Sequence, residues 1–307
     1  MGSRSEASRL GALARLKTAL LVAVAAVLGI TVPVGGDALE VLITPLVIVL
    51  VYSSLRSVEI EDLHAGTIGP AAVSLLLSYV ALPAAAIVVG TALLSRSAFL
   101  GVLAMAVGPT TAGSALVWTR LSSGNVAVAG LVSVASVALA PLVTPALVAP
   151  SVGTRVSVAP LSILRELGIV VGTGAALAWV VPERIVSDDR MDGVSLVAIT
   201  VLVYVAVVTS AASDPSLAAI VPVGAAALAI TGFGFVLAFG AAMAFDLSAG
   251  QRRALYFATS LKNLGIAIVV GSVLANRGGV GTATVAYYVV QQLASGLVVG
   301  SLSPVSV

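Results

Sequence analysis

The chain has 307 residues, of which 59% are hydrophobic and 9% are charged, whereas about a quarter of the residues in a soluble domain are charged. This composition excludes a soluble globular protein and indicates a polytopic membrane protein. The 30 glycines and the low aromatic content of 5% are typical of apolar helices that pack closely in lipid. A net charge of +2 gives no reason to expect a nucleic-acid partner, and the absence of cysteine excludes disulfides and thiolate metal sites.

Ten apolar runs are long enough to form membrane-spanning helices, which need about 20 mostly apolar residues. The first run follows several basic residues, as in a signal peptide, but its apolar stretch is long for one and no clear cleavage site follows, so we interpret it as a span. We expect residues 1–307 to form a single transmembrane domain in the lipid bilayer. In chain order the runs cover about residues 17–34, 38–55, 68–93, 98–119, 125–148, 161–181, 193–212, 217–245, 254–275 and 281–302.

The basic residues between these runs predict the orientation of the chain. If the N-terminus lies in the cytoplasm, ten lysines and arginines fall on the cytoplasmic side and four on the other side, which agrees with the excess of positive charge in cytoplasmic loops. Ten spans then return the C-terminus to the cytoplasm. We expect a multi-pass protein of the cell membrane.

The fourth and ninth runs each contain a polar, helix-breaking sequence, at 108–114 and at 259–265. Gly113 and Asn263, near the two centres, lie 150 positions apart, close to half the chain. Five spans per half is an odd number, so the second half begins on the opposite side of the membrane and any repeat is inverted. Paired, interrupted helices are typical of secondary transporters. The sequence predicts an all-α polytopic membrane protein with ten transmembrane helices in two inverted five-helix repeats, at about 15–150 and 160–303.

Lys262 is the only ionisable residue that we place well inside a span. It lies roughly 12 Å from Ala254 at the cytoplasmic end, at 1.5 Å per residue. Such a charge costs about 2.5–3.5 kcal/mol on insertion scales, so it needs a partner, water or the loss of its proton. In a functional interpretation, Lys262 lies in a transport cavity as a contact for an anion or as a proton-linked switch. In a structural interpretation, it is bound to carbonyl groups that the helix break releases.

Other polar side chains lie in or near the two interruptions. Thr110, Thr111 and Ser114 follow the break at Gly108, where they either contact a substrate or bond back to their own backbone. Asn263 is a stronger candidate, because a buried amide needs partners for both of its ends.

Two further pairs lie in neighbouring spans. Gln291 and Gln292 lie midway along the last span, and adjacent helical residues point about 100° apart, so at most one of them faces the core. We expect one of the two to join helices. Ser133 and Ser136 lie one turn apart and either face the fourth span or simply pack.

Several classes of activity are excluded by the motifs that the chain lacks. There is no phosphate-binding lysine motif, which excludes ATP-driven transport within this chain. We place no metal-ligating pair and no Ser-His-Asp set inside the membrane, so we expect neither an enzyme nor a bound metal or cofactor.

Seven segments, in the right order along nearly the whole chain, carry a resemblance to a known family. They are LVYSSLR at 50–56, LSYVALP at 77–83, GPTTA at 108–112, GNVA at 124–127, APLVTP at 140–145, RRAL at 252–255 and KNLGIA at 262–267. In these motifs the chain resembles the bile acid:sodium symporter family. The resemblance implies two inverted five-helix repeats, a panel domain and a core domain, and broken helices four and nine that cross at the substrate cavity.

The resemblance also implies which positions would hold a coupled sodium ion, and several of these differ here. Ser78 stands where sodium-coupled members have Gln, and Ala258 and Lys262 stand where they have Glu and Gln, whereas Asn263 and Ser133 match. An ammonium in place of an anionic ligand would repel a nearby sodium ion. We therefore expect that transport is not coupled to sodium in the classical way.

The sequence predicts a secondary transporter that moves a small organic anion by alternating access, with a proton or sodium as the alternatives for the coupling ion. An arsenite or oxyanion efflux permease is a second candidate, although the functional cysteine of arsenite permeases has no counterpart here. A non-transporting receptor with the same fold is a third. Candidate substrate-binding residues are Thr110, Thr111, Ser114, Lys262, Asn263, Gln291 and Gln292, and candidate ion-coupling residues are Lys262, Asn263, Ser133, Ser136 and Ser78.

Overall fold

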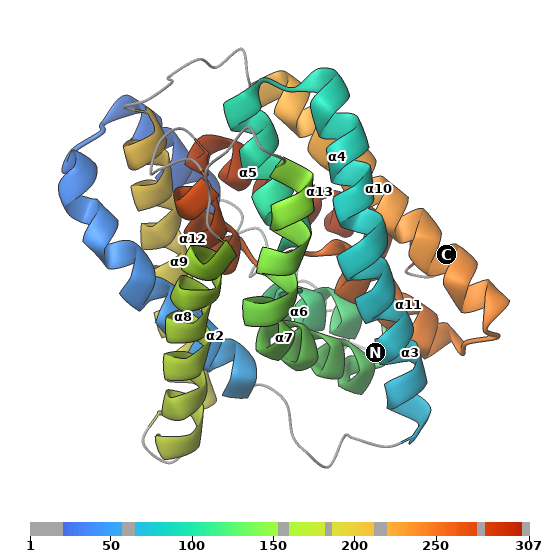
Figure 1. Ribbon diagram of the computed structural model, residues 1–307. Coiled ribbons are helices and arrows are strands. Elements are labelled where there is room, and N and C mark those ends of the chain that lie inside the picture. Colours follow the sequence, from blue (N-terminus) through green and yellow to red (C-terminus); the bar gives the residue numbers. More distant parts are fainter. Residues whose placement is uncertain are drawn as a thin grey trace.

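The computed structural model describes residues 21–56, 65–152, 160–181, 186–211, 220–274 and 280–302, which fold into helices (Figure 1). In this part of the chain there is no strand, and the one isolated β-bridge joins Thr110 to Lys262. The helices are Leu21–Thr31, η1 (Gly36–Leu42), α2 (Ile43–Arg56), α3 (Ala65–Leu76), η3 (Leu77–Ala81), α4 (Leu82–Leu93), α5 (Arg96–Val107), α6 (Ala112–Leu121), α7 (Val126–Val152), α8 (Pro160–Val180), α9 (Asp188–Ala211), α10 (Ile220–Ala244), α11 (Ala249–Ser260), α12 (Leu264–Leu274) and α13 (Gly281–Leu302).

Among the described residues, seven helices are long and apolar enough to cross a membrane, and each coincides with a predicted span. Two other predicted spans, 98–119 and 254–275, each consist of two shorter helices, α5 with α6 and α11 with α12. The remaining one, 17–34, is described only from residue 21 onward. The seven long helices are Ala38–Arg56, Gly66–Leu93, Val126–Ser151, Pro160–Val180, Arg190–Ser210, Ile220–Ala244 and Gly281–Leu302.

The first break follows directly from a glycine and a proline. Helix α5 ends at Val107, and Gly108 is extended, with φ −68° and ψ 162°. A residue before proline disfavours the helical conformation, because the proline ring clashes with its backbone. Helix α6 therefore begins only at Ala112, after Thr111. The interruption predicted at 108–114 is present over the first four of these residues.

The second break contains no proline, and an asparagine defines where the helix resumes. Helix α11 ends at Ser260, and Leu261 is extended, with φ −93° and ψ 121°. Asn263 Oδ1 then accepts a hydrogen bond of 3.1 Å from the backbone N–H of Ile266, in the manner of a helix N-cap. The interruption predicted at 259–265 is therefore confined to residues 261–263.

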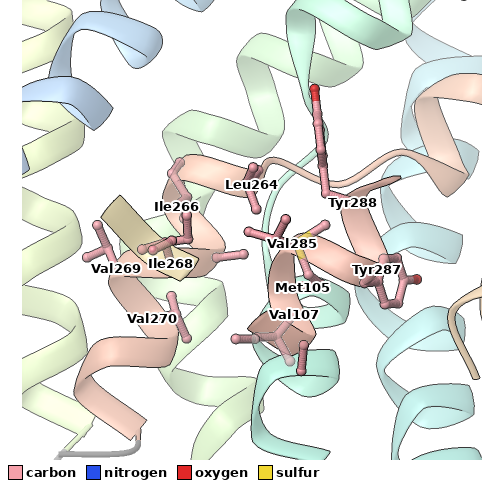
Figure 2. Close-up of a cluster of buried hydrophobic side chains, with 14 of the residues drawn as sticks. Met105, Val107, Leu264, Ile266, Ile268, Val269, Val270, Val285, Tyr287 and Tyr288 are labelled. Carbon is pink, nitrogen blue, oxygen red and sulfur yellow. The ribbon is translucent and has the colours of Figure 1, made fainter. Parts of the chain in front are cut away.

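The broken helices lie inside the protein, between two groups of longer helices. Helices α2, α8 and α9 pack together on one side, and α4 and α10 pack together on the other (Figure 1). Between them, α5, α12 and α13 share a buried apolar cluster in which Met105 and Val107 lie near Leu264, Ile266 and Val285 (Figure 2). Water is therefore excluded from most of the two breaks, and their backbone groups need partners within the protein.

The outer faces of the long helices expose large apolar side chains. Leu142 is 67% exposed, Trp179 90%, Val236 68% and Leu297 76%. In a soluble protein such faces would be a liability. On helices of this length they are suited to contact with lipid chains.

Candidate functional site

The backbones of the two breaks pair with each other. The N–H of Asn263 donates to the carbonyl of Pro109 at 2.9 Å, and the N–H of Thr111 donates to the carbonyl of Leu261 at 3.2 Å. These two bonds form the antiparallel bridge between residues 110 and 262. Unwound backbone at membrane depth is tolerated only where its polar groups are satisfied within the protein or by water. Each break thus supplies partners for the other.

The side chain of Lys262 is completely buried at this crossing. Its Nζ donates to the carbonyl oxygen of Ser78 at 2.8 Å, to the hydroxyl of Ser78 at 2.7 Å and to the carbonyl oxygen of Gly108 at 3.0 Å. It also lies 5.4 Å from the centre of the Tyr79 ring, within the range of a cation–π contact. The three acceptors match the three N–H groups of an ammonium.

The Ser78 carbonyl is available to Lys262 because of a local irregularity in its own helix. Residues 77–81 form a π-helical turn, in which the N–H of Leu82 bonds to the carbonyl of Leu77 rather than to that of Ser78. The next donor along the chain would be residue 83, and Pro83 has no N–H. The Ser78 oxygen therefore has no partner in its own helix. The second carbonyl acceptor, that of Gly108, is released where α5 ends.

No acidic side chain is available in the helices around Lys262. Helices α3 to α7 and α10 to α13 contain neither Asp nor Glu within their bounds. The nitrogen is held by two carbonyls and a hydroxyl, all of them neutral. A charged ammonium at this place therefore has no acidic partner within the bounds of these described helices.

The two predicted serines of α7 differ in their roles, since Ser136 supports the first break and the Ser133 hydroxyl bonds within α7. Ser136 Oγ accepts a hydrogen bond from the N–H of Thr110 at 3.0 Å and donates to the carbonyl of Ser133 at 2.9 Å. The Ser136 carbonyl accepts a bond of 2.6 Å from the Tyr79 hydroxyl. Ser133 Oγ bonds back to the carbonyl of Ala129. The interpretation that these serines face the fourth span therefore holds for Ser136, while the Ser133 hydroxyl serves its own helix.

Gln291 holds the second break from the last helix. Its Oε1 accepts a bond of 3.0 Å from the backbone N–H of Lys262, and its Nε2 donates to the carbonyl of Lys262 at 2.9 Å. The residue is completely buried. Thr110 plays a related part, since its Oγ1 donates to the carbonyl of Ala258 at 2.7 Å. These side chains hold the crossing in place and provide hydrogen-bond partners for its backbone groups.

A second polar group lies between α6 and α13 and is only partly buried. Gln292 Nε2 donates to Ser114 Oγ at 2.7 Å, and Trp118 Nε1 donates to Gln292 Oε1 at 2.8 Å. Tyr288 lies one helical turn before Gln292 on α13. Only one glutamine of the pair is fully buried, as expected, but both of them join helices. We call Ser114, Trp118, Tyr288 and Gln292 the α6–α13 cluster.

The structure thus separates the predicted residues into groups. The side chain of Lys262 binds Ser78, and the backbone of Lys262 binds Gln291. Ser114 and Gln292 form a separate, more accessible group. Asn263 acts as a helix cap through its side-chain oxygen, and Thr111 contributes its backbone N–H to the bridge.

Sequence reasoning missed Tyr79, Pro83, Trp118 and Tyr288 as contributors to these groups. A signal for Pro83 was present, because a proline inside a predicted span always leaves a carbonyl without its helical donor. The aromatic residues gave no such signal, since their spacing is equally typical of packing.

Comparison with known families places the chain among transporters. The sequence profile of the SBF-like CPA transporter family matches residues 17–302, nearly the whole chain. No curated protein matches the chain by sequence. The profile confirms the predicted kinship with bile acid:sodium symporters at the level of the family and agrees with the apolar helices of a multi-pass membrane protein. The chain therefore belongs to the SBF-like CPA transporter family.

Proposed function

We propose that the protein is a secondary transporter of a small organic anion and that it does not use sodium as its coupling ion. The observation that carries this proposal is the position of Lys262. Its nitrogen lies at the crossing of the two broken helices, where its hydrogen-bond partners among the described residues are neutral oxygen atoms of Ser78 and Gly108. This arrangement of carbonyl and hydroxyl oxygens is one that a metal cation would also accept, and here a tethered cation fills it.

The electrostatics of the crossing favour an anion and disfavour a second cation. Two unit charges 4 Å apart repel by about 4 kcal/mol at an effective dielectric of 20. A sodium ion beside Lys262 would experience this repulsion, whereas a carboxylate would be attracted by a similar amount. The N-termini of α6 and α12 also lie at the crossing, beginning at Ala112 and Leu264, and helix N-termini favour negative charge.

The α6–α13 cluster is our proposed place for the polar part of the substrate. Ser114 and Gln292 belong to this partly buried group and carry N–H and O–H donors that suit a carboxylate. The partly buried ring of Trp118 offers apolar surface for the rest of a small organic molecule, while the Tyr288 ring beneath is buried. The substrate-binding residues that we propose are thus Lys262 together with this cluster, while Thr110 and Gln291 maintain the crossing.

We also propose that the chain crosses the membrane ten times as two inverted repeats, at about 15–150 and 160–303. The reciprocal bonds between residues 109–111 and 261–263 support this, because equivalent segments of an inverted repeat would pair in this symmetric way. Both termini then lie in the cytoplasm of a cell-membrane protein. Because the chain has no native cysteine, a cysteine placed at Asp188 tests the topology, and labelling of it from outside sealed cells would overturn this arrangement.

A two-step experiment tests the function. Purified protein is screened by thermal shift against anionic metabolites, with Lys262→Met as the matched control, and any anion that stabilises only the parent is then tested for uptake into liposomes. We expect uptake of at least one such anion in sodium-free buffer. Binding without translocation under any ion gradient would instead support a receptor, and transport of arsenite alone would support an oxyanion permease.

A further inference from the structure

Of the three acceptors that the described residues supply to Lys262 Nζ, the hydroxyl of Ser78 alone can reverse its hydrogen bond. We propose that Ser78 is a positioning residue for proton-linked transport, because its hydroxyl holds Lys262 in the same place whether the lysine is charged or neutral. This inference rests on the proposed function and names its coupling ion as the proton.

A charged lysine has three N–H groups and no lone pair, whereas a neutral one has two N–H groups and one lone pair. The carbonyl oxygens of Ser78 and Gly108 only accept hydrogen bonds, and they serve two N–H groups in either state. The third position is the Ser78 hydroxyl, 2.7 Å away. A hydroxyl can rotate to accept from an ammonium or donate to an amine. All groups at the nitrogen are therefore satisfied in both states.

The proton step is a simple transfer between Lys262 and water. When the crossing opens toward one side of the membrane, an N–H bond of the ammonium breaks and the proton passes to a water molecule on that side. The electron pair stays on Nζ, where it accepts a hydrogen bond from Ser78. Opening toward the other side reverses the transfer. One proton then accompanies each cycle, and the side chain keeps its position throughout.

No other group at the nitrogen is suited to hold the proton. The ring of Tyr79 faces Lys262, but its hydroxyl donates to the carbonyl of Ser136. Helices α4, α7, α10 and α12 carry no titratable side chain, and α3 carries none either. The other surrounding helices carry seven titratable residues, and in the described structure none of them is hydrogen-bonded to Lys262 Nζ. These residues are Arg96 on α5, Arg120 on α6, Arg252, Arg253 and Tyr256 on α11, and Tyr287 and Tyr288 on α13.

The composition of the chain permits a direct observation of this proton. Lys17 and Lys262 are the only lysines in the sequence, so Lys17→Arg leaves a single lysine. The full-length variant, labelled with ¹⁵N at the lysine side chain and placed in lipid nanodiscs, gives one Nζ signal by solid-state NMR. The chemical shift of this signal distinguishes an ammonium from an amine. The pH is varied up to about 10, near the ordinary range for lysine.

Three substitutions in this background test the role of Ser78. Ser78→Ala removes a hydrogen bond from both states, and the loss is greater for the ammonium because charge-assisted bonds are the stronger ones. We expect the ratio of amine to ammonium at a fixed pH to rise about tenfold, the effect of one hydrogen bond of ordinary strength. Ser78→Thr retains a hydroxyl and should change the ratio less than about twofold. Ser74→Ala is the matched control, because that buried hydroxyl bonds to Thr259 and not to Lys262.

Two results would overturn the inference. An ammonium signal at every pH would show a permanent cation, and an unchanged ratio in Ser78→Ala would show that the hydroxyl is not needed. If Ser78→Ala does not fold, a large change in the ratio for Ser78→Thr would count equally against the inference.

The proposed function is tested separately by anion uptake without sodium, so a permanent ammonium together with such uptake would reject proton coupling alone. If Lys262 loses its proton as proposed but uptake depends strictly on sodium, the proposed function alone would be rejected.

Discussion

Thr110 and Lys262 lie 152 positions apart in the sequence and form an antiparallel backbone bridge where the two broken helices meet. The bridge satisfies backbone groups that each break would otherwise leave unpaired away from water. Position 262 thus combines a backbone that joins the helices with a side chain that binds Ser78 and Gly108. Because the bridge does not require a lysine, substitution at this position tests the side chain alone.

Replacing Lys262 by alanine should create a site for a small free cation. The substitution leaves the carbonyls of Ser78 and Gly108 without their donor, and each buried, unpaired group costs about 1–3 kcal/mol. We expect the variant to have a lower melting temperature, and methylammonium should restore part of the loss. Tetramethylammonium has no N–H group and should restore nothing. Equal stabilisation of the variant by both cations would show that these carbonyls do not form a cation site.

Pro83→Ala tests why the Ser78 carbonyl is free. The alanine N–H lies five residues after Ser78 and can bond to its carbonyl within the π-helical turn. Lys262 then shares this acceptor, so the ratio of amine to ammonium seen by NMR should rise, as for Ser78→Ala. Pro150→Ala, in α7, is the control for adding an N–H to a helix elsewhere. The parent ratio in both variants would show that Pro83 is not the reason why the Ser78 carbonyl is free.

The adjacent glutamines of α13 should differ sharply in their effects. Gln291→Leu leaves the backbone N–H and carbonyl of Lys262 unpaired in a buried place, at a cost of about 2–4 kcal/mol. Gln292→Leu breaks bonds to the side chains of Ser114 and Trp118, which are only partly buried and have access to water. We expect a loss of stability below about 1 kcal/mol for the second variant, together with weaker anion binding. Thermal unfolding with and without the anion separates the two effects, and similar losses for both variants would contradict the assignment.

Gly281 allows α13 to approach α9 closely, and a larger residue should push the two apart. A Cβ at this position would overlap the carbonyl oxygen of Ala206 and the hydroxyl of Ser210. Overpacking of this kind costs about 1–3 kcal/mol. Gly300→Ala is the matched control on the same helix, since nothing lies within 4 Å of its added Cβ. Thermal unfolding in detergent should show a lower melting temperature for Gly281→Ala only.

The positions of the long helices and of both breaks could be predicted from the sequence, because they depend on local features. Apolar runs of sufficient length define the spans, and Gly108 followed by Pro109 cannot continue a helix. The second break was visible as a polar interruption around Asn263, although its side chain proves to cap the next helix. A buried lysine in that interruption also indicated an unusual site.

The partners of the candidate residues could not be predicted, because they come from distant parts of the chain. Ser78 and Lys262 lie 184 positions apart, and the choice of Ser78 as a partner depends on a π-helical turn that no local pattern indicated. Ser114 and Gln292 lie 178 positions apart. Such contacts depend on how the helices rotate and cross, which is decided by packing across the whole molecule.

In the proposed function, the amine of Lys262 takes the place of a coupled sodium ion. The most direct measurement is uptake of the identified anion into liposomes under a sodium gradient or a pH gradient, for the parent and for Lys262→Gln. We predict that uptake responds to the pH gradient and not to sodium, and that Lys262→Gln abolishes the response to pH while the protein remains folded. Strict dependence on sodium, with Lys262→Gln nearly neutral, would contradict the account and would instead indicate a sodium site formed by Asn263, Ser133 and the released carbonyls.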